Sequence, residues 1–512
     1  MKKHIQTSKM KNQKGITLLA LVITIIVLLI LAGITIRAIT GDNGIIGNAG
    51  QAKKETEIAS EKEIVEKATI QAMGNNKYGN IEESELQDEL DKETEEGKTK
   101  ATDIGDEFEV IFIDSNRYYI VDRDGNVEGE YPINIDKNPG DFTIGEEGET
   151  LDGSTDHPYE ISCIEDLVVL SNISRGKGNY IENGEIKEAE RNTFSGKNFI
   201  LTQTLNFNST VSYADLSMTW RYDDGEEAYV IDENSTQNLK DLLMDKNGVG
   251  FMPISDSNVL RTQAFAGIFD GQNYEIQNLY ENIEDGGGLF NKLNTATIKN
   301  LGLTNVDIIS GEVGGIVKNS YLTDFYNCYV SGKIKGTQVG GIANTASGGK
   351  IINCYNLSMI ESSGRAGGIV AYVDAGGSIT IVNSYNKGEI ITNGTSVGYH
   401  TSSGIIGTAY HSKGTRNIIN SCSIGEIISK RLTAGNFYYA SGEAIVGLQN
   451  CYYLDTIVNE KVIANENSIA FSKGDESVIN KLNTYAKEHK NDYAVELYTW
   501  KLDSNGLPTF EK

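Results

Sequence analysis

The sequence predicts a mainly β protein: a β-solenoid with capped ends, preceded by a transmembrane helix and a small α+β region. Three observations support this prediction. Two short sequence blocks recur together between about residues 265 and 455. An uncharged run of 21 residues lies near the N-terminus. The composition, with 55 Gly, 26 Tyr and only 5 Pro in 512 residues, suits many short strands joined by tight turns.

The uncharged run is Ile16–Ile36, ITLLALVITIIVLLILAGITI. As a helix it would span about 31 Å, which matches the core of a bilayer. Five lysines and no acidic residue precede the run, and acidic residues dominate the chain after it. The positive-inside rule then places the N-terminus in the cytoplasm and the body outside. A cleaved secretory signal is the alternative, but the apolar core of such signals is usually about 7–15 residues long.

The junction between the basic leader (residues 1–15) and this helix is Lys14-Gly15-Ile16. It resembles the class III leader of type IV prepilins, a family in which a prepilin peptidase cuts after the glycine and methylates the new N-terminus. The resemblance covers about forty residues. It implies processing at Gly15 and Ile16, with a prepilin peptidase as partner. The family's glutamate, which helps to register neighbouring helices in a pilus, is Ala20 here, so the resemblance supports anchoring more than polymerisation.

Residues 37–133 are predicted to form a helix followed by a small antiparallel sheet. Ile58, Val65 and Ala72 recur at intervals of seven residues and form one thin apolar stripe on a helix over 53–73. Two β-type runs, 108–113 and 117–121, are separated by an Asp-Ser-Asn turn. This arrangement is the one expected of a pilin-like head. The polar, Gly- and Asp-rich stretch 134–156 is predicted to be a linker.

The repeated blocks are an apolar Gly-Gly motif, such as Gly314-Gly315-Ile316-Val317, and a later motif centred on Asn. Successive motif asparagines are 27, 26, 30, 37 and 30 residues apart, a period typical of a solenoid whose coils stack to share one core. Asn tolerates the left-handed backbone of a tight turn, and its amide can donate and accept hydrogen bonds along the stack. The predicted column comprises Asn300, Asn327, Asn353, Asn383, Asn420 and Asn450.

The residue after each asparagine is small or apolar, which predicts an inward-facing column that includes Cys328, Cys354 and Cys451. Cys328 and Cys354 would lie one rung apart, within about 5 Å. Two interpretations stay open: buried free thiols that pack as small hydrophobes, or a disulfide between neighbouring rungs. None of the five cysteines belongs to a CxxC pair, so no metal site is predicted.

These repeats resemble the GLUG-motif family of bacterial surface and adhesin-like proteins, which form parallel β-helices. Segments at 157–161, 196–201 and 265–271 are similar to the lead-in of such repeats. The resemblance covers about 157–512 and implies a parallel β-helix over 157–455, with residues 205–260 looping out and a C-terminal cap over 456–512. Within the cap, Asp475 is expected to cap a short helix, and Asn505-Gly506 predicts a hairpin.

The sequence gives little indication of catalytic activity. Parallel β-helices also host polysaccharide lyases and hydrolases, which need clustered Asp with Lys or Arg on one face. Asp270, Asp307, Asp324 and Asp374 fall at different phases of the repeat and form no column. GxSxG, HExxH, P-loop and dinucleotide motifs are absent from the sequence. The chain is therefore predicted not to be an enzyme, with no catalytic residue and no cofactor.

The predicted function is that of a membrane-anchored bacterial protein whose β-helix, displayed at the cell surface, mediates adhesion or another surface interaction. Its ligand would be a glycan or a protein on a host or a neighbouring cell. Net charge is -26, and the part after the five leader lysines is near -31 (-26 minus 5), which argues against binding nucleic acid. Two alternatives are a cell-surface enzyme acting on polysaccharide and a minor pilin or pseudopilin subunit.

Overall fold

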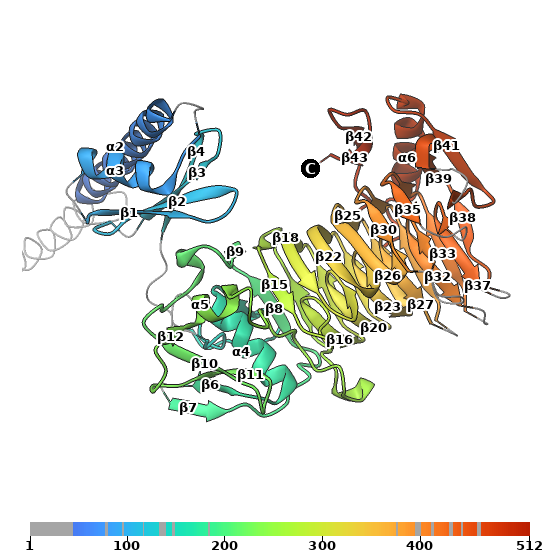
Figure 1. The fold of residues 1–512 in the computed structure, drawn as a ribbon, viewed down its shortest axis with the longest axis horizontal. Coiled ribbons are helices and arrows are strands. Elements are labelled where there is room, and N and C mark those ends of the chain that lie inside the picture. The colour runs from blue at the N-terminus through green and yellow to red at the C-terminus, as the bar shows by residue number, and fades with distance from the viewer. Residues whose placement is uncertain are drawn as a thin grey trace, which may run out of the picture. The chain divides into compact units, whose positions relative to one another are not determined.

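The computed structural model describes residues 45–76, 80–94, 97–115, 117–132, 140–145, 149–182, 185–374, 377–394, 401–410, 414–429, 434–441, 444–457 and 462–511. They belong to two compact units, Met1–Ile133 and Asn134–Lys512 (Figure 1). The leader and the segment Ile16–Ile36 lie outside the described residues. Among the helices of the described residues, none has the length and apolar character needed to cross a bilayer.

The N-terminal unit combines two helices with a four-stranded antiparallel sheet in the order β1-β2-β3-β4. Its elements are α2 (Ile45–Asn75), α3 (Glu83–Glu93), β1 (Thr99–Asp103), β2 (Glu107–Phe112), β3 (Arg117–Asp122) and β4 (Val127–Pro132). The two strands expected from the sequence are β2 and β3. The acidic stretch before them contributes α3 and β1 as well, because Leu86 and Leu90 give α3 a buried face.

Small residues on one side of α2 let the helix pack closely on this sheet. Val65, Ala68 and Ala72 are all fully buried in one cluster with residues of β2 and β3. Arg117 on β3 donates from Nε and Nη2 to the two carboxylate oxygens of Glu61 on α2, both at 2.8 Å. Burial raises the pKa of Glu61, but the hydrogen bonds from Arg117 and its neighbours outweigh it and hold that pKa below its usual value.

The C-terminal unit contains a solenoid of parallel strands, which confirms the prediction of a parallel β-solenoid (Figure 1). The first wall of each coil belongs to a nine-stranded sheet made of β5 (Tyr159–Ile161), β8 (Asn198–Leu201), β13 (Ile268–Asp270), β17 (Thr297–Lys299), β21 (Asp324–Tyr326), β24 (Gly349–Ile352), β28 (Ile379–Val382), β33 (Arg416–Ile419) and β38 (Gly447–Gln449).

The second wall follows the turn that holds the asparagine of each repeat. It comprises β9 (Leu205–Asn206), β14 (Glu275–Gln277), β15 (Tyr280–Asn282), β18 (Gly302–Ile309), β19 (Glu312–Gly314), β22 (Tyr329–Gly340), β25 (Tyr355–Asn356), β26 (Met359–Gly367), β29 (Tyr385–Asn386), β30 (Ile390–Thr392), β31 (Ser402–Ser403), β34 (Cys422–Ser423), β35 (Ile427–Ser429), β36 (Ala434–Gly435), β39 (Cys451–Leu454), β40 (Val462–Ile463) and β41 (Ser468–Phe471).

The third wall begins after the glycine doublets. It is a six-stranded sheet of β16 (Phe290–Asn294), β20 (Val317–Tyr321), β23 (Ala343–Ser347), β27 (Val370–Val373), β32 (Ile406–Tyr410) and β37 (Tyr438–Ser441). The doublets permit the bend into this wall because neighbouring coils approach closely there. A Cβ at Gly341 would lie 2.1 Å from the carbonyl oxygen of Gly368, and one at Gly368 would lie 2.0 Å from that of Gly404.

The first coils are covered by a folded N-terminal region, which corrects two predictions. Its elements are α4 (Ile164–Arg175), β6 (Asn179–Glu182), β7 (Glu185–Glu188), the 3-10 turns Thr210–Ser212 and Arg261–Gln263, β10 (Thr219–Asp223), β11 (Ala228–Ile231), β12 (Gln237–Asn238) and α5 (Leu239–Met244). Residues 205–260 do not simply loop out, because Trp220, Tyr229 and Phe251 are buried in the main core. In the expected linker, Phe142 is buried too, with its ring 5.4 Å from that of Tyr159 and 5.6 Å from that of Phe199.

The C-terminal segment contains the expected helix and hairpin. They are α6 (Glu476–Glu488), which follows the 3-10 turn Asp455–Ile457 and strands β40 and β41, and the antiparallel pair β42 (Trp500–Leu502) and β43 (Pro508–Phe510). Asp475 accepts a hydrogen bond from the Ser477 amide at 3.0 Å and caps α6. The expected cap over 456–512 needs a correction, however. Residues 462–463 and 468–471 still pair as solenoid strands, and the segment 476–511, called the tail below, packs along the side of the coils.

Candidate binding groove

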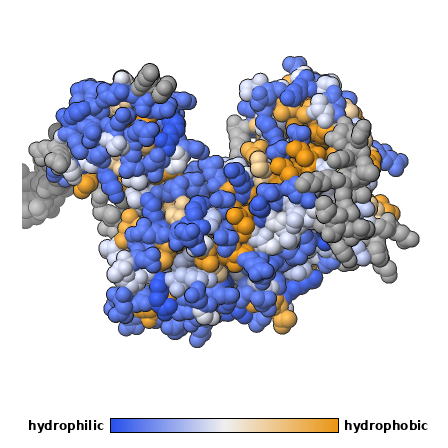
Figure 2. All heavy atoms as spheres, in the orientation of Figure 1, coloured by the Kyte–Doolittle hydropathy of each residue, from blue (hydrophilic) through white to orange (hydrophobic). Residues whose placement is uncertain are grey.

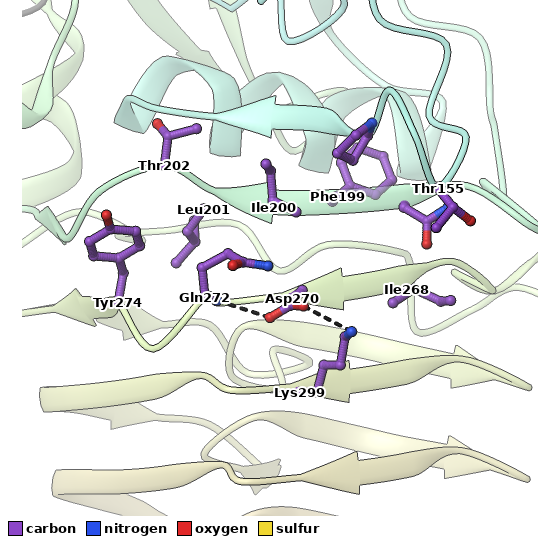
Figure 3. Close-up of a pocket in the computed structure, with 12 residues that line it drawn as sticks. Thr155, Phe199, Ile200, Leu201, Thr202, Ile268, Asp270, Gln272, Tyr274 and Lys299 are labelled. Atoms are coloured by element: carbon purple, nitrogen blue, oxygen red, sulfur yellow. Dashed lines mark hydrogen bonds and ion pairs between the residues drawn. The ribbon is translucent and has the colours of Figure 1, made fainter. Parts of the chain in front are cut away.

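A groove runs over the outer face of the first wall where the solenoid begins (Figure 3). In β8, β13 and β17 the central residues point inward, and Phe199, Phe269 and Ile298 are fully buried. Because side chains alternate along a strand, the flanking residues face outward. Two outward columns result from the register: Asn198, Ile268, Thr297 and Asp324 in one, and Ile200, Asp270, Lys299 and Tyr326 in the other.

The groove has a volume of about 470 Å³ and combines polar groups with an aromatic ring. Lys299 and Asp270 come from neighbouring strands, while Gln272 and Tyr274 come from the turn that follows β13 (Figure 3). Gln272 has a φ of 52°, in the left-handed region typical of a tight turn, and its side chain and that of Tyr274 line the groove. Tyr274 is 40% exposed, which leaves its ring available for stacking.

Asp270 organises the polar side of the groove. Its Oδ1 accepts a hydrogen bond from the main-chain amide of Gln272 at 2.9 Å, and its Oδ2 lies 2.9 Å from Lys299 Nζ (Figure 3). Asp270 Oδ1 also accepts from Asn300 Nδ2 at 2.9 Å. Both carboxylate oxygens are therefore engaged. Lys299 keeps more than a third of its side chain exposed and has further N–H groups to offer. Asp270 is thus placed to orient Lys299 towards a ligand.

The four aspartates weighed as lyase candidates are only partly brought together. Asp270 and Asp324 share the outer face of the first wall, in different columns, as predicted from their phases. Asp324 accepts hydrogen bonds from the Lys350 amide at 2.8 Å and from the Tyr326 hydroxyl at 2.7 Å. Asp307 lies on the second wall, 3.1 Å from Lys246, and Asp374 follows β27 in the third wall. The repeat phases of these aspartates did not reveal that Asp270 and Asp324 lie on the same face.

The six predicted asparagines form a continuous ladder at the corner between the first and second walls. Each has a positive φ, between 49° and 57°. Each side chain donates from Nδ2 to Oδ1 of the asparagine one rung earlier, at distances of 2.8, 2.8, 2.8, 2.7 and 2.5 Å from Asn327 to Asn450. The left-handed turn and the amide explain why Asn recurs at this position.

This ladder ends at the groove. Its first member, Asn300, donates to Asp270 Oδ1, so all six amides point their donors towards one carboxylate. Aligned hydrogen bonds polarise one another and strengthen the last bond of the chain. Asp270 is therefore held by the whole corner of the solenoid as well as by its immediate neighbours.

The column after the asparagines is buried, and all five cysteines are free thiols. Cys328 and Cys354 donate to main-chain oxygens of Tyr326, at 3.2 Å, and Ile352, at 3.3 Å. Burial raises the pKa of the Cys354 thiol well above its usual value. Of the two interpretations that the sequence left open, the structure agrees with buried free thiols and not with a disulfide.

Outward residues on both sides of the later asparagines are apolar, and the tail covers them. Ile352 and Val382 lie on one side, packed with Tyr485 and Leu497. The other side carries a stack of tyrosines, in which the rings of Tyr329 and Tyr355, and of Tyr355 and Tyr385, are 4.8 Å apart. In the space-filling view, apolar surface gathers where the tail meets the last coils (Figure 2).

The expected processing residues Gly15 and Ile16 lie outside the described residues. Within the described part of the chain, no group of three or more His, Cys, Asp or Glu side chains could hold a metal ion. No protein-family model matches the sequence, and a search of curated proteins finds none similar to it.

Sequence reasoning did not identify the groove residues Asn198, Gln272, Tyr274 and Lys299. One signal was present, namely the residue just before each ladder asparagine. It is charged in the coil of Lys299, aromatic in the coil of Tyr326, aliphatic in the coils of Ile352, Val382 and Ile419, and polar again at Gln449 in the last. That change along the solenoid marks where the outer face passes from open to covered.

Proposed function

We propose that the chain is a membrane-anchored, surface-displayed bacterial protein whose β-solenoid binds a glycan in the groove over β8, β13 and β17. The observation behind this proposal is the groove itself, which Lys299, Gln272 and Asn198 line together with the exposed Tyr274. The Asp270 carboxylate and the asparagine ladder hold the polar side of the groove in place.

This combination of groups suits a sugar. Binding sites commonly pair an apolar or aromatic surface with a few placed polar groups that fix orientation. The Tyr274 ring offers a face for the C–H side of a pyranose, and the side-chain amide of Gln272 can form hydrogen bonds with the sugar hydroxyls. The Lys299 ammonium favours an acidic sugar. Strands about 4.8 Å apart repeat these outward positions along the solenoid, which favours a linear polysaccharide over a single sugar.

Anchoring and display rest on the N-terminal sequence. The uncharged run Ile16–Ile36 and the Lys14-Gly15-Ile16 junction support a prepilin-type segment. The long helix α2 against a four-stranded antiparallel sheet is the arrangement expected of a pilin-like head. N-terminal sequencing of the mature protein tests this part. An N-methylated Ile16 supports it, whereas an intact Met1 or a start beyond Gly33 contradicts it.

Binding is tested with the full-length chain, purified in detergent, on a panel of neutral and acidic polysaccharides. We expect an acidic polysaccharide to bind best. Tyr274→Ala and Lys299→Ala should each weaken that binding about tenfold, which corresponds to about 1.4 kcal/mol. Lys333→Ala, at an exposed position on the second wall, is the matched control and should change nothing.

Three results would contradict the proposal. The first is a wild-type chain that binds none of the polysaccharides. The second is binding that Tyr274→Ala and Lys299→Ala leave unchanged. The third is cleavage of the bound polysaccharide by the wild-type chain, which would favour the enzyme alternative over a binding protein.

A further inference from the structure

The asparagine ladder binds the main chain of an extended segment where the tail crosses it. Asn353 Nδ2 donates to the Glu496 carbonyl at 2.8 Å, and Asn353 Oδ1 accepts from the Tyr498 amide at 3.1 Å. One rung later, Asn383 Nδ2 donates to the Tyr498 carbonyl at 3.0 Å. Both contacted residues offer only main-chain groups to the ladder, so this recognition does not depend on their side chains.

The flanking columns hold the side chains of the same segment. Leu497 is buried among Tyr326, Ile352 and Val382. The Tyr498 ring lies 5.3 Å from that of Phe510, beside the tyrosine stack. The corner of the solenoid therefore works as a peptide track, with amides in the middle and an apolar column on each side.

The track continues beyond the tail towards the N-terminal coils. Asn353, Asn383 and Asn420 are fully buried, whereas Asn327 and Asn300 are half-buried. Each Asn amide has two N–H groups. In Asn327 one of them donates to Asn300, and within the described part of the chain the other meets no acceptor. A pocket of about 490 Å³ lies over Asn327, lined by residues 495–499 and Glu511.

We propose that this pocket receives an extended segment of another polypeptide, which continues the path of residues 495–500 over Asn327 and Asn300 and carries a Lys or Arg. Continuity with the contacts of the tail gives the main-chain recognition. The charge of the segment follows from the exposed carboxylates of Glu496 and Glu511 on the pocket wall. The residues that line this pocket do not line the glycan groove, so either proposal can fail alone.

The test uses the full-length chain and a labelled nine-residue peptide of alternating Thr and Val with a central Lys, followed by fluorescence anisotropy. Thr499→Trp fills the pocket from an exposed position without touching the ladder, and should raise the Kd about tenfold or more. Glu496→Gln with Glu511→Gln should raise it up to about fivefold, the range of exposed charge pairs. Thr484→Trp, at an exposed site on α6 outside the pocket, should leave the Kd unchanged.

Two further peptides separate the parts of the proposal. A peptide with Glu in place of the central Lys should bind more weakly to the wild type and equally well to the double Gln variant. A peptide N-methylated at alternate residues should bind more weakly, because it cannot donate to a ladder Oδ1 as the Tyr498 amide does to Asn353, although its carbonyls can still accept from Asn327. The proposal is overturned if the Lys peptide does not bind, if Thr499→Trp has no effect, or if the methylated peptide binds as tightly as the unmodified one.

Discussion

The first and the last coils of the solenoid share one repeat but present opposite outer faces. In the early coils, the outward column just before the corner carries Asp270 and Lys299, and the face lies open as a groove. In the later coils the same position is Ile352 or Val382, fully buried beneath the tail. The inward residues, apolar in both regions, build the coil, and the outward residues decide whether a face is covered or left free for a ligand.

An exchange of outward residues tests this comparison with the largest expected effect. Ile352→Lys places a charge without a partner under the tail and should destabilise the fold by about 3–5 kcal/mol. The reciprocal change Lys299→Ile, on the open face, removes one half-exposed ion pair to Asp270 and should cost only about 1 kcal/mol. Urea denaturation of both variants measures the difference. Equal losses would show that the two faces do not differ in this way.

Removal of Trp500, which holds the tail on the coils, should cause the next largest loss of stability. Trp500 packs against Tyr385 and Phe510, and its Nε1 donates to Asn383 Oδ1 at 2.7 Å. Trp500→Ala should cost about 3–4 kcal/mol, because it creates a cavity and removes this bond. Limited proteolysis should then cut within 476–511 while the coils stay intact. Lys501→Ala, at the exposed next position, is the control and should leave the tail resistant.

Each asparagine of the ladder should contribute more to folding stability under the tail than in the open coils. Asn383 exchanges hydrogen bonds with Asn353, Asn420, Tyr498 and Trp500, whereas among the residues the structure describes the Asn300 side chain bonds only Asp270 and Asn327. Glycine keeps the left-handed backbone, so Asn→Gly isolates the amide. We expect Asn383→Gly to cost about 2–3 kcal/mol and Asn300→Gly about 1 kcal/mol in thermal unfolding. The reverse order would contradict the account.

The two regions should also differ in their response to pH. Burial raises the pKa of Glu281 to about 8 and that of Glu165 to about 7. Glu281 lies on β15 in the first coils, and Glu165 lies on α4 in the region that covers them. A carboxyl with a raised pKa in the folded state stabilises the fold most below its unfolded pKa, and this stability is lost as pH rises towards the folded pKa. The loss is at most about 1.4 kcal/mol per pH unit for each group.

Hydrogen exchange followed by mass spectrometry measures this response coil by coil, after correction for intrinsic rates. Between pH 5 and pH 8 the early coils should lose protection before the late ones. In Glu281→Gln the difference between the regions should shrink. Uniform loss of protection along the solenoid would argue against a role for these buried acids.

The sequence predicted the inside of the solenoid better than its outside. The spacing of Asn327 and Asn353 located the ladder because every coil must turn at the same corner. It did not locate the tail, because residues 476–511 do not repeat and their partners, such as Asn353 for Glu496, are 143 residues away. It also placed Asp270 outside any column, since no repeat signal shows that this carboxylate ends the ladder. Phe142 was assigned to a linker because one aromatic residue in a polar stretch gives no periodic signal.

Thr297 and Thr380 allow the most direct test of the central claim, that the open early coils are the binding face. Both lie in the same outward column, Thr297 on β17 and Thr380 on β28. Thr297→Cys and Thr380→Cys can each be labelled with a benzophenone maleimide, since the five native thiols are buried. After illumination with a bound acidic polysaccharide, we expect cross-links from position 297 and none from position 380. Equal cross-linking from both positions, or cross-linking only from 380, would contradict the claim.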